Sequence, residues 1–215
     1  RSGRSARPAG AGGRAGRQEM RRSAGRQAPA FIHRRIPTFE LLSEEGLQLV
    51  EDKADQILAE VGMEIRDDPE SLRLFAQAGA AVDGVTVRFE PGLVASLCAT
   101  APAQFVQHAR NPSRSVQIGG DAAVLAPTYG SPFVRDLDGG RRYGTIADFR
   151  NFVKLAYLTP WLHHSGGTVC EPVDVPVNKR HLDMVAAHLR YSDKGFMGSV
   201  THPSRAADSI EMARI

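Results

Sequence analysis

The chain has 215 residues, 42% of them hydrophobic, and a formal net charge of +3, which suffices to bury a core in one or two globular domains. No apolar run approaches the roughly 20 residues that cross a bilayer, and the arginine-rich start lacks the apolar centre of a secretory signal, so neither membrane insertion nor export is expected. Cys98 and Cys170 form no CxxC pair, which argues against a disulfide scaffold or cysteine-rich metal cluster and favours the reducing cytoplasm.

The positive charge belongs to the start of the chain. Residues 1–35 hold ten Arg and one Glu, a balance of +9, whereas the rest sums to −6. Low-complexity composition predicts a disordered, solvated leader over residues 1–30. Such an arm could bind nucleic acid or an acidic partner, but it has no interleaved aromatics, so nucleic acid is not expected. Because the chain starts with Arg and stops at Ile215 inside a helical run, we expect a fragment of a longer protein.

Residues 31–144 are predicted to form an α+β region. Ser43 and Asp68, the second followed by a proline, are helix N-caps, and glycines end both helices. The helices are expected at residues 43–62, 68–79 and 91–98. Strands are expected at residues 85–89, 105–108, 115–118, 122–125, 133–137 and 141–143. The last two flank Asp138-Gly139-Gly140, which is typical of a hairpin turn, so a small antiparallel sheet is predicted.

Residues 145–215 change to an alternating pattern. Thr145 and Asp148 have capping-box spacing at the start of a helix. A buried strand over 161–169, a helix over 177–192, a strand over 195–200 and an unfinished helix from residue 204 follow. Strand, helix, strand, helix is typical of a parallel α/β fold, so this part is interpreted as two βα units.

Several blocks resemble one known family. They are APTYGSPFVRDL (126–137), GTIADF (144–149), GGTVCEPVDVP (166–176), RHLDM (180–184) and DKGFMGS (193–199). Their order and spacing are similar to those of the trimethylamine methyltransferase family, above all its bacterial members, over about residues 31–215.

The resemblance implies a TIM-type (β/α)8 barrel preceded by the α+β region, with residues 145–215 as its truncated start. It also implies transfer of a methyl group from a tertiary or quaternary amine, such as trimethylamine or glycine betaine, to the cobalt of a corrinoid (cobalamin) carried by a separate partner protein. Archaeal members place pyrrolysine in the active site, and its position would lie beyond residue 215. The catalytic residues are therefore expected outside this chain, which we expect to be inactive alone. A homo-oligomer is left open.

A trimethylammonium head group, as in glycine betaine, cannot donate a hydrogen bond, so aromatic faces and a carboxylate suit its recognition. In a barrel these groups sit at the carboxyl ends of the strands. The candidates that meet this description are His163, His164, Glu171, Ser199, His202 and Tyr129, with Phe133 and Thr201 as further possibilities. Each has a plainer interpretation: a packed histidine, a carboxylate paired with a nearby Arg, a core aromatic, or a helix cap over residues 201–203.

Two alternatives to this function stay open. The chain could be a non-catalytic interaction protein with a basic leader, or another βα-barrel enzyme that shares only the scaffold. No metal site is expected, because the His, Cys and Glu residues near Cys170 lack a recognised zinc spacing. His181 and His188, seven apart on one helix, are interpreted as a solvated or interface stripe.

Overall fold

A computed structural model describes residues 29–198 and 200–214. The chain divides into two compact units, a small unit over Ile36–Ala103 and a large unit formed by the residues before and after it. The boundary predicted between residues 144 and 145 stays a prediction. The leader predicted over residues 1–30 lies outside the described residues, apart from Pro29 and Ala30. Within the described part, no helix is long and apolar enough to cross a membrane.

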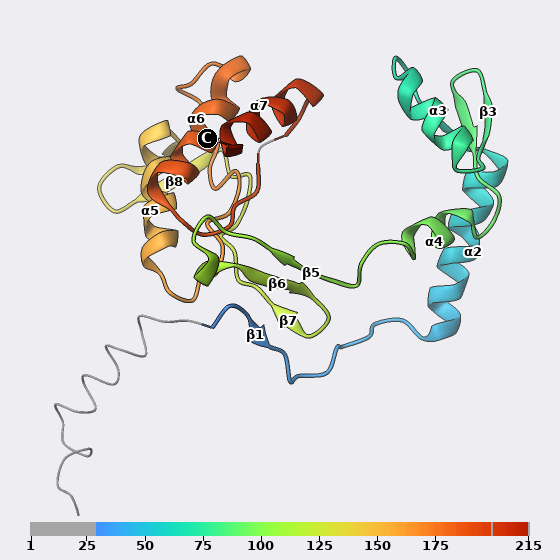
Figure 1. Ribbon diagram of the computed structural model, residues 1–215, viewed down its shortest axis with the longest axis horizontal. Coiled ribbons are helices and arrows are strands. Elements are labelled where there is room, and N and C mark those ends of the chain that lie inside the picture. The colour runs from blue at the N-terminus through green and yellow to red at the C-terminus, as the bar shows by residue number, and fades with distance from the viewer. Residues whose placement is uncertain (1–28, 199, 215) are drawn as a thin grey trace, which may run out of the picture. The chain divides into compact units, whose positions relative to one another are not determined.

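The small unit combines three helices with a three-stranded sheet (Figure 1). Its elements are α2 (Glu44–Glu60), β2 (Met63–Glu64), α3 (Pro69–Gln77), β3 (Ala81–Asp83), β4 (Thr86–Arg88) and α4 (Leu93–Cys98). The sheet has the order β2-β4-β3 and is antiparallel. Val87 and Phe89 are buried at its centre, with the ring of Phe75 edge-on to Phe89 at 5.4 Å between centroids.

Local sequence explains where these helices begin and end. The hydroxyl of Ser43 accepts from the Gly46 amide at the start of α2, and the Asp68 carboxylate accepts from the Ser71 amide at the start of α3. Gly62 has a φ of +77° and its Cα lies against the Val87 carbonyl, where a side chain has no room. The predicted helices and their caps are therefore confirmed.

The large unit contains two further antiparallel sheets. They are built from β1 (Ile32–His33), β5 (Gln104–Gln107), β6 (Val116–Gly119), β7 (Ala122–Ala123), β8 (Phe133–Asp136) and β9 (Gly140–Tyr143). The first has the order β1-β7-β6-β5, and β8 and β9 form the hairpin. Gly140 takes the positive φ of +63° that the turn requires. The predicted antiparallel strands and the hairpin are thus confirmed.

Three helices complete the large unit: α5 (Ile146–Leu158), α6 (Val177–Tyr191) and α7 (Pro203–Arg214). Both halves of the predicted capping box at Thr145 and Asp148 are formed. Helices α5 and α6 pack together around one buried cluster. Its members are Val134, Phe149, Val153, Cys170, Met184 and Ala187. Because Val134 comes from the hairpin, that hairpin is part of the same core.

The strands predicted over residues 161–169 and 195–200 are wrong as regular strands, since the described residues of both segments form loops. The segments nevertheless run side by side in the same direction. The Ser165 amide donates to the Gly195 carbonyl and the Met197 amide to the Gly166 carbonyl, both at 2.9 Å. Gly166 has a φ of +87°, which interrupts the regular ladder after one bond. The sheets described are all antiparallel and none is closed.

Candidate functional site

The glycine-rich loop after residue 165 packs tightly against two other segments. A Cβ added to Gly166 would lie 2.8 Å from a Val169 methyl and 3.3 Å from Pro127. The Gly130 amide donates to the Thr168 carbonyl at 2.7 Å. The loop therefore depends on glycine for its close approach to the segment before the hairpin.

Tyr129 and Met197 meet over this loop. The Tyr129 hydroxyl contacts the Met197 sulfur at 3.0 Å, and the tyrosine ring covers Gly167, where a Cβ would come within 2.6 Å of it. The two side chains are 47% and 44% exposed, and partial burial raises the pKa of Tyr129. An aromatic face beside a thioether is a polarisable, apolar surface of the kind that attracts a quaternary ammonium.

A buried histidine ties the loop to α6. The His188 Nε2–H donates to the Gly167 carbonyl at 2.9 Å, so in the neutral ring Nδ1 accepts from the Ser165 hydroxyl, at 3.0 Å. The ring stacks on Phe196 at 5.1 Å and meets the edge of Phe149 at 5.4 Å. Burial lowers the pKa of His188, which keeps the ring neutral and this hydrogen-bond arrangement intact.

His163 and His164 both point into the protein. His164 Nδ1 accepts from the Gly166 amide at 3.0 Å, and burial, followed by the like charge of His188, lowers the pKa of His164 to about 4. His163 Nδ1 accepts from the Leu125 amide at 3.0 Å. Burial and then the Lys194 charge lower its pKa as well. In both residues, Nδ1 fixes a main-chain segment, as the packed-histidine interpretation expects.

Glu171 is paired within the protein. Arg180 Nη1 lies 2.6 Å from Glu171 Oε1, while Nε and Nη2 of the same arginine donate to the Val175 carbonyl at 3.1 and 3.0 Å. This geometry matches the plainer interpretation of Glu171, a carboxylate neutralised by a neighbouring Arg.

The remaining candidates lie away from the loop. His202 Nδ1 accepts from the Ser204 amide at 3.2 Å, which makes His202 a cap of α7, and Arg205 donates to the Thr201 hydroxyl. Phe133 stacks on Tyr143 across the hairpin, at 4.7 Å. Ser199 lies outside the described residues. The structure thus places Tyr129 and His164 in contact with the loop, whereas the side chains of His163, Glu171 and Phe133 contact other segments.

The sequence did not predict the burial or the partners of two histidines on α6. His181 and His188 are 3% and 2% exposed, so of the two alternatives, a solvated or an interface stripe, the solvated one is wrong. His181 bonds Asp208 of α7 at 2.8 Å. Their seven-residue spacing placed them on one face, but α5 and α7 cover that face, and helical periodicity alone cannot distinguish this from solvent.

Lys194 binds main-chain carbonyls at and just after the carboxyl end of α5. Its ammonium is 4% exposed and donates to the carbonyls of Ala156, at 2.7 Å, and Thr159, at 2.9 Å, as well as to Leu162. Burial lowers the pKa of Lys194 to about 8. The side chain therefore caps the carboxyl end of α5 with a charge of the sign the helix dipole favours.

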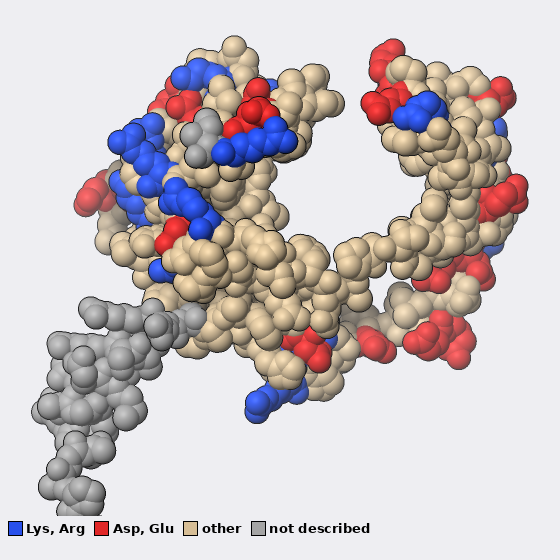
Figure 2. All heavy atoms as spheres, in the orientation of Figure 1, with Lys and Arg blue, Asp and Glu red and all other residues tan. Residues whose placement is uncertain are grey.

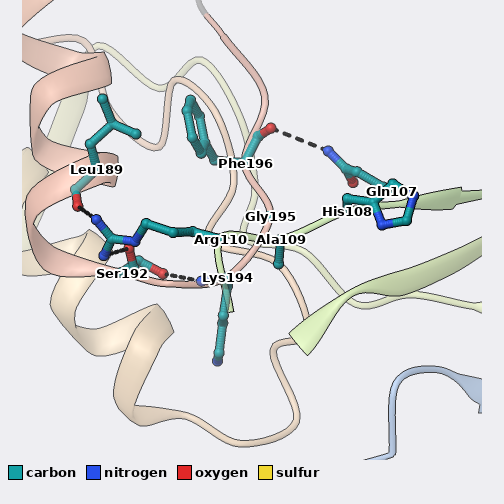
Figure 3. Close-up of a pocket in the computed structure, with 9 residues that line it drawn as sticks. All are labelled: Gln107, His108, Ala109, Arg110, Leu189, Ser192, Lys194, Gly195 and Phe196. Atoms are coloured by element: carbon teal, nitrogen blue, oxygen red, sulfur yellow. Dashed lines mark hydrogen bonds between the residues drawn. The ribbon is translucent and has the colours of Figure 1, made fainter. Parts of the chain in front are cut away.

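A small cavity of about 90 Å³ opens beside Lys194 and Phe196 (Figure 3). Arg110 crosses it to donate to the carbonyls of Leu189 and Ser192, at 2.7 and 3.0 Å, and Gln107 donates to Phe196. Ligand pockets generally exceed about 300 Å³. This cavity is therefore too small to be a complete substrate site.

Cys170 is completely buried. Burial, and next the nearby Asp148 charge, raise the pKa of its thiol to about 11, so the thiol stays protonated near neutral pH. Across the described ranges, no three His, Cys, Asp or Glu side chains gather closely enough to hold a metal ion.

Comparison with known proteins gives consistent matches. The family described as trimethylamine methyltransferase matches residues 10–215. The chain is 43% identical over 180 residues to a glycine betaine methyltransferase of Desulfitobacterium hafniense (strain Y51), covering 84% of this chain and 37% of that protein. It is 31% identical over 155 residues to an L-carnitine:corrinoid methyltransferase of Eubacterium limosum, covering 68% and 31%. The chain spans about a third of the length of these relatives.

Proposed function

The chain belongs to the trimethylamine methyltransferase family, and from this premise we propose that the full-length protein demethylates a quaternary amine of the glycine betaine type. The methyl group passes to the cobalt of a corrinoid held by a separate protein. The observation that carries the proposal is the 43% identity to a glycine betaine methyltransferase over 84% of the chain. The second relative, whose name includes a corrinoid, supports the choice of acceptor.

In this proposal, the segments around residues 165 and 195 begin the inner wall of a parallel βα barrel. Their two main-chain hydrogen bonds run in the order expected of parallel neighbours. Regular strands would form once further strands pair with them, because an isolated pair has no neighbour on either edge. The glycine-rich loop then lies at the carboxyl end of the first strand, on the rim where barrel enzymes build their sites.

Tyr129 and Met197 are assigned to the substrate cation. The tyrosine face attracts the trimethylammonium group through its ring quadrupole, and the thioether adds dispersion without a competing charge. The hydrogen bonds of His188 with Ser165 and Gly167 hold the loop under the tyrosine ring. The loop therefore orients the substrate through a fixed surface, and orientation dominates the barrier of an in-line transfer.

A reduced corrinoid supplies the cobalt nucleophile that accepts the methyl group. The groups that complete the reaction are proposed to lie in the part of the protein beyond this chain.

The test combines the full-length protein with a reduced corrinoid protein and follows the visible spectrum of cobalt. Glycine betaine should convert cobalt to its methylated form and release dimethylglycine, and carnitine and trimethylamine serve as competing substrates. No methylation with any amine would reject the proposal and favour a non-catalytic interaction protein. Turnover of an amine without cobalt methylation would favour a different barrel enzyme.

A further inference from the structure

Helix α2 and its C-cap residue carry an apolar stripe that the small unit does not bury. Its members are Leu47, Val50, Ala54, Ile57 and Val61. The four larger side chains are 42–66% exposed. Their spacing alternates between three and four residues, which is the narrow a/d seam of a pair of helices rather than the broad stripe of a helix on a core.

The small unit uses a different side of the same helix. Leu58 and Ala59 are half-buried, the Leu58 carbonyl accepts from the Phe89 amide at 3.1 Å, and Asp55 accepts from the Gly92 amide at 2.7 Å. At 100° per residue, this side lies roughly 100° around the helix from the seam. The seam is thus available for another partner while α2 stays attached to its own sheet.

Charged side chains flank the seam in a self-complementary pattern. Lys53 and Glu60 lie on one flank, and Gln56 bridges them through contacts of 2.8 and 2.9 Å. If a second copy of α2 packs antiparallel, with Ala54 opposite Ile57, Val50 lies opposite Val61 of that copy. The same alignment places Lys53 beside Glu60 of the other copy, twice by symmetry. Parallel packing would instead place Lys53 beside Leu58 and leave Glu60 without a cation.

We propose that this seam joins two copies of the protein through an antiparallel, two-fold pairing of α2. A two-fold axis requires a patch that matches itself, and the Lys53 and Glu60 pattern meets that requirement. Residues 36–103 carry 13 acidic and 4 basic side chains, and acidic groups dominate the visible face of the small unit (Figure 2). In a dimer, the acidic groups of the two copies repel one another. These groups lie outside the two flanks, and charges more than about 8 Å apart are largely screened at physiological salt.

Charge reversal tests the pairing in the full-length protein at about 0.15 M salt. Sedimentation equilibrium should show a dimer. Lys53→Glu or Glu60→Lys alone should raise its dissociation constant about tenfold, since each places like charges together at both symmetric contacts. The double variant should return it to near the original value. Asp52→Lys, the same charge change as Glu60→Lys but on the far side of α2, is the control and should not weaken the dimer.

Cross-linking tests the orientation. Cys98 is exposed, so the variants are made with Cys98→Ser. A mixture of Val50→Cys and Val61→Cys proteins should form mixed disulfide dimers, whereas each protein alone should cross-link poorly. A monomer at all concentrations would overturn the proposal and indicate that the seam is covered within one chain. A dimer whose dissociation constant is unchanged in both single variants, Lys53→Glu and Glu60→Lys, or that cross-links Val50→Cys to itself, would overturn it as well.

Discussion

The buried histidine cluster makes a quantitative prediction about acid stability. The imidazole of His164 is 3% exposed, and its pKa is lowered from 6.5 to about 4. Between these two pH values, the unfolded chain binds a proton that the folded chain does not. Stability therefore falls as pH falls through this window, by up to about 1.4 kcal/mol per pH unit for one proton and by no more than about 3.4 kcal/mol in total.

The assay is urea unfolding of the full-length protein at several pH values from 7.5 to 4, compared with a His164→Asn variant. The asparagine oxygen can replace Nδ1 as acceptor for the Gly166 amide but does not titrate. We expect the variant to be less stable at pH 7, because it leaves a cavity, and its stability to decline more shallowly as pH falls.

The comparison is needed because other groups titrate too. The pKa values of His163 and His188 are also lowered, so these two groups contribute to the decline in both proteins. If the two stability curves ran parallel from pH 6.5 to 4, His164 would not be the buried neutral group that the structure describes, and the reasoning would be refuted.

Substitutions at three other residues give separate tests. Lys194→Met removes the donor to three main-chain carbonyls, and the urea-unfolding free energy should fall by about 3 kcal/mol because buried acceptors lose their partner; an unchanged value would contradict the capping role. Glu171→Gln should cost about 1 kcal/mol or less and leave KM for glycine betaine within about twofold, whereas a large rise in KM would place the carboxylate on the substrate. Tyr129→Ala should raise that KM about tenfold while Tyr129→Phe keeps it near normal; equal losses would instead implicate the hydroxyl.

Features set by neighbouring residues could be predicted from the sequence. Thr145 and Asp148 lie three apart, so the capping box depends on local geometry alone, and it forms as expected. The hairpin around Gly139 and Gly140 is equally local. The caps at Ser43 and Asp68 belong to the same class, because one side chain and one nearby amide decide them.

Features that depend on residues far apart in the sequence were harder to predict. The apolar segments at 161–169 and 195–200 indicated strands, but a strand needs neighbours, and Gly166 adopts a positive φ that breaks the ladder. Periodicity placed His181 and His188 on one helix face without revealing that Asp208 and the loop at Gly167 receive them. In the site, Tyr129 was a candidate because an aromatic face suits a methylated ammonium, whereas its place over Gly167 and its contact with Met197 required the fold.

The two cysteines of these 215 residues differ in accessibility, so a thiol-reactive probe can be directed to one of them. Cys98 is accessible, while the enclosed, protonated Cys170 cannot form a thiolate at neutral pH. A maleimide dye should therefore attach at the end of α4 and leave the core of the large unit untouched. Fluorescence from that position would report on the small unit alone, without any engineered cysteine in this part of the protein.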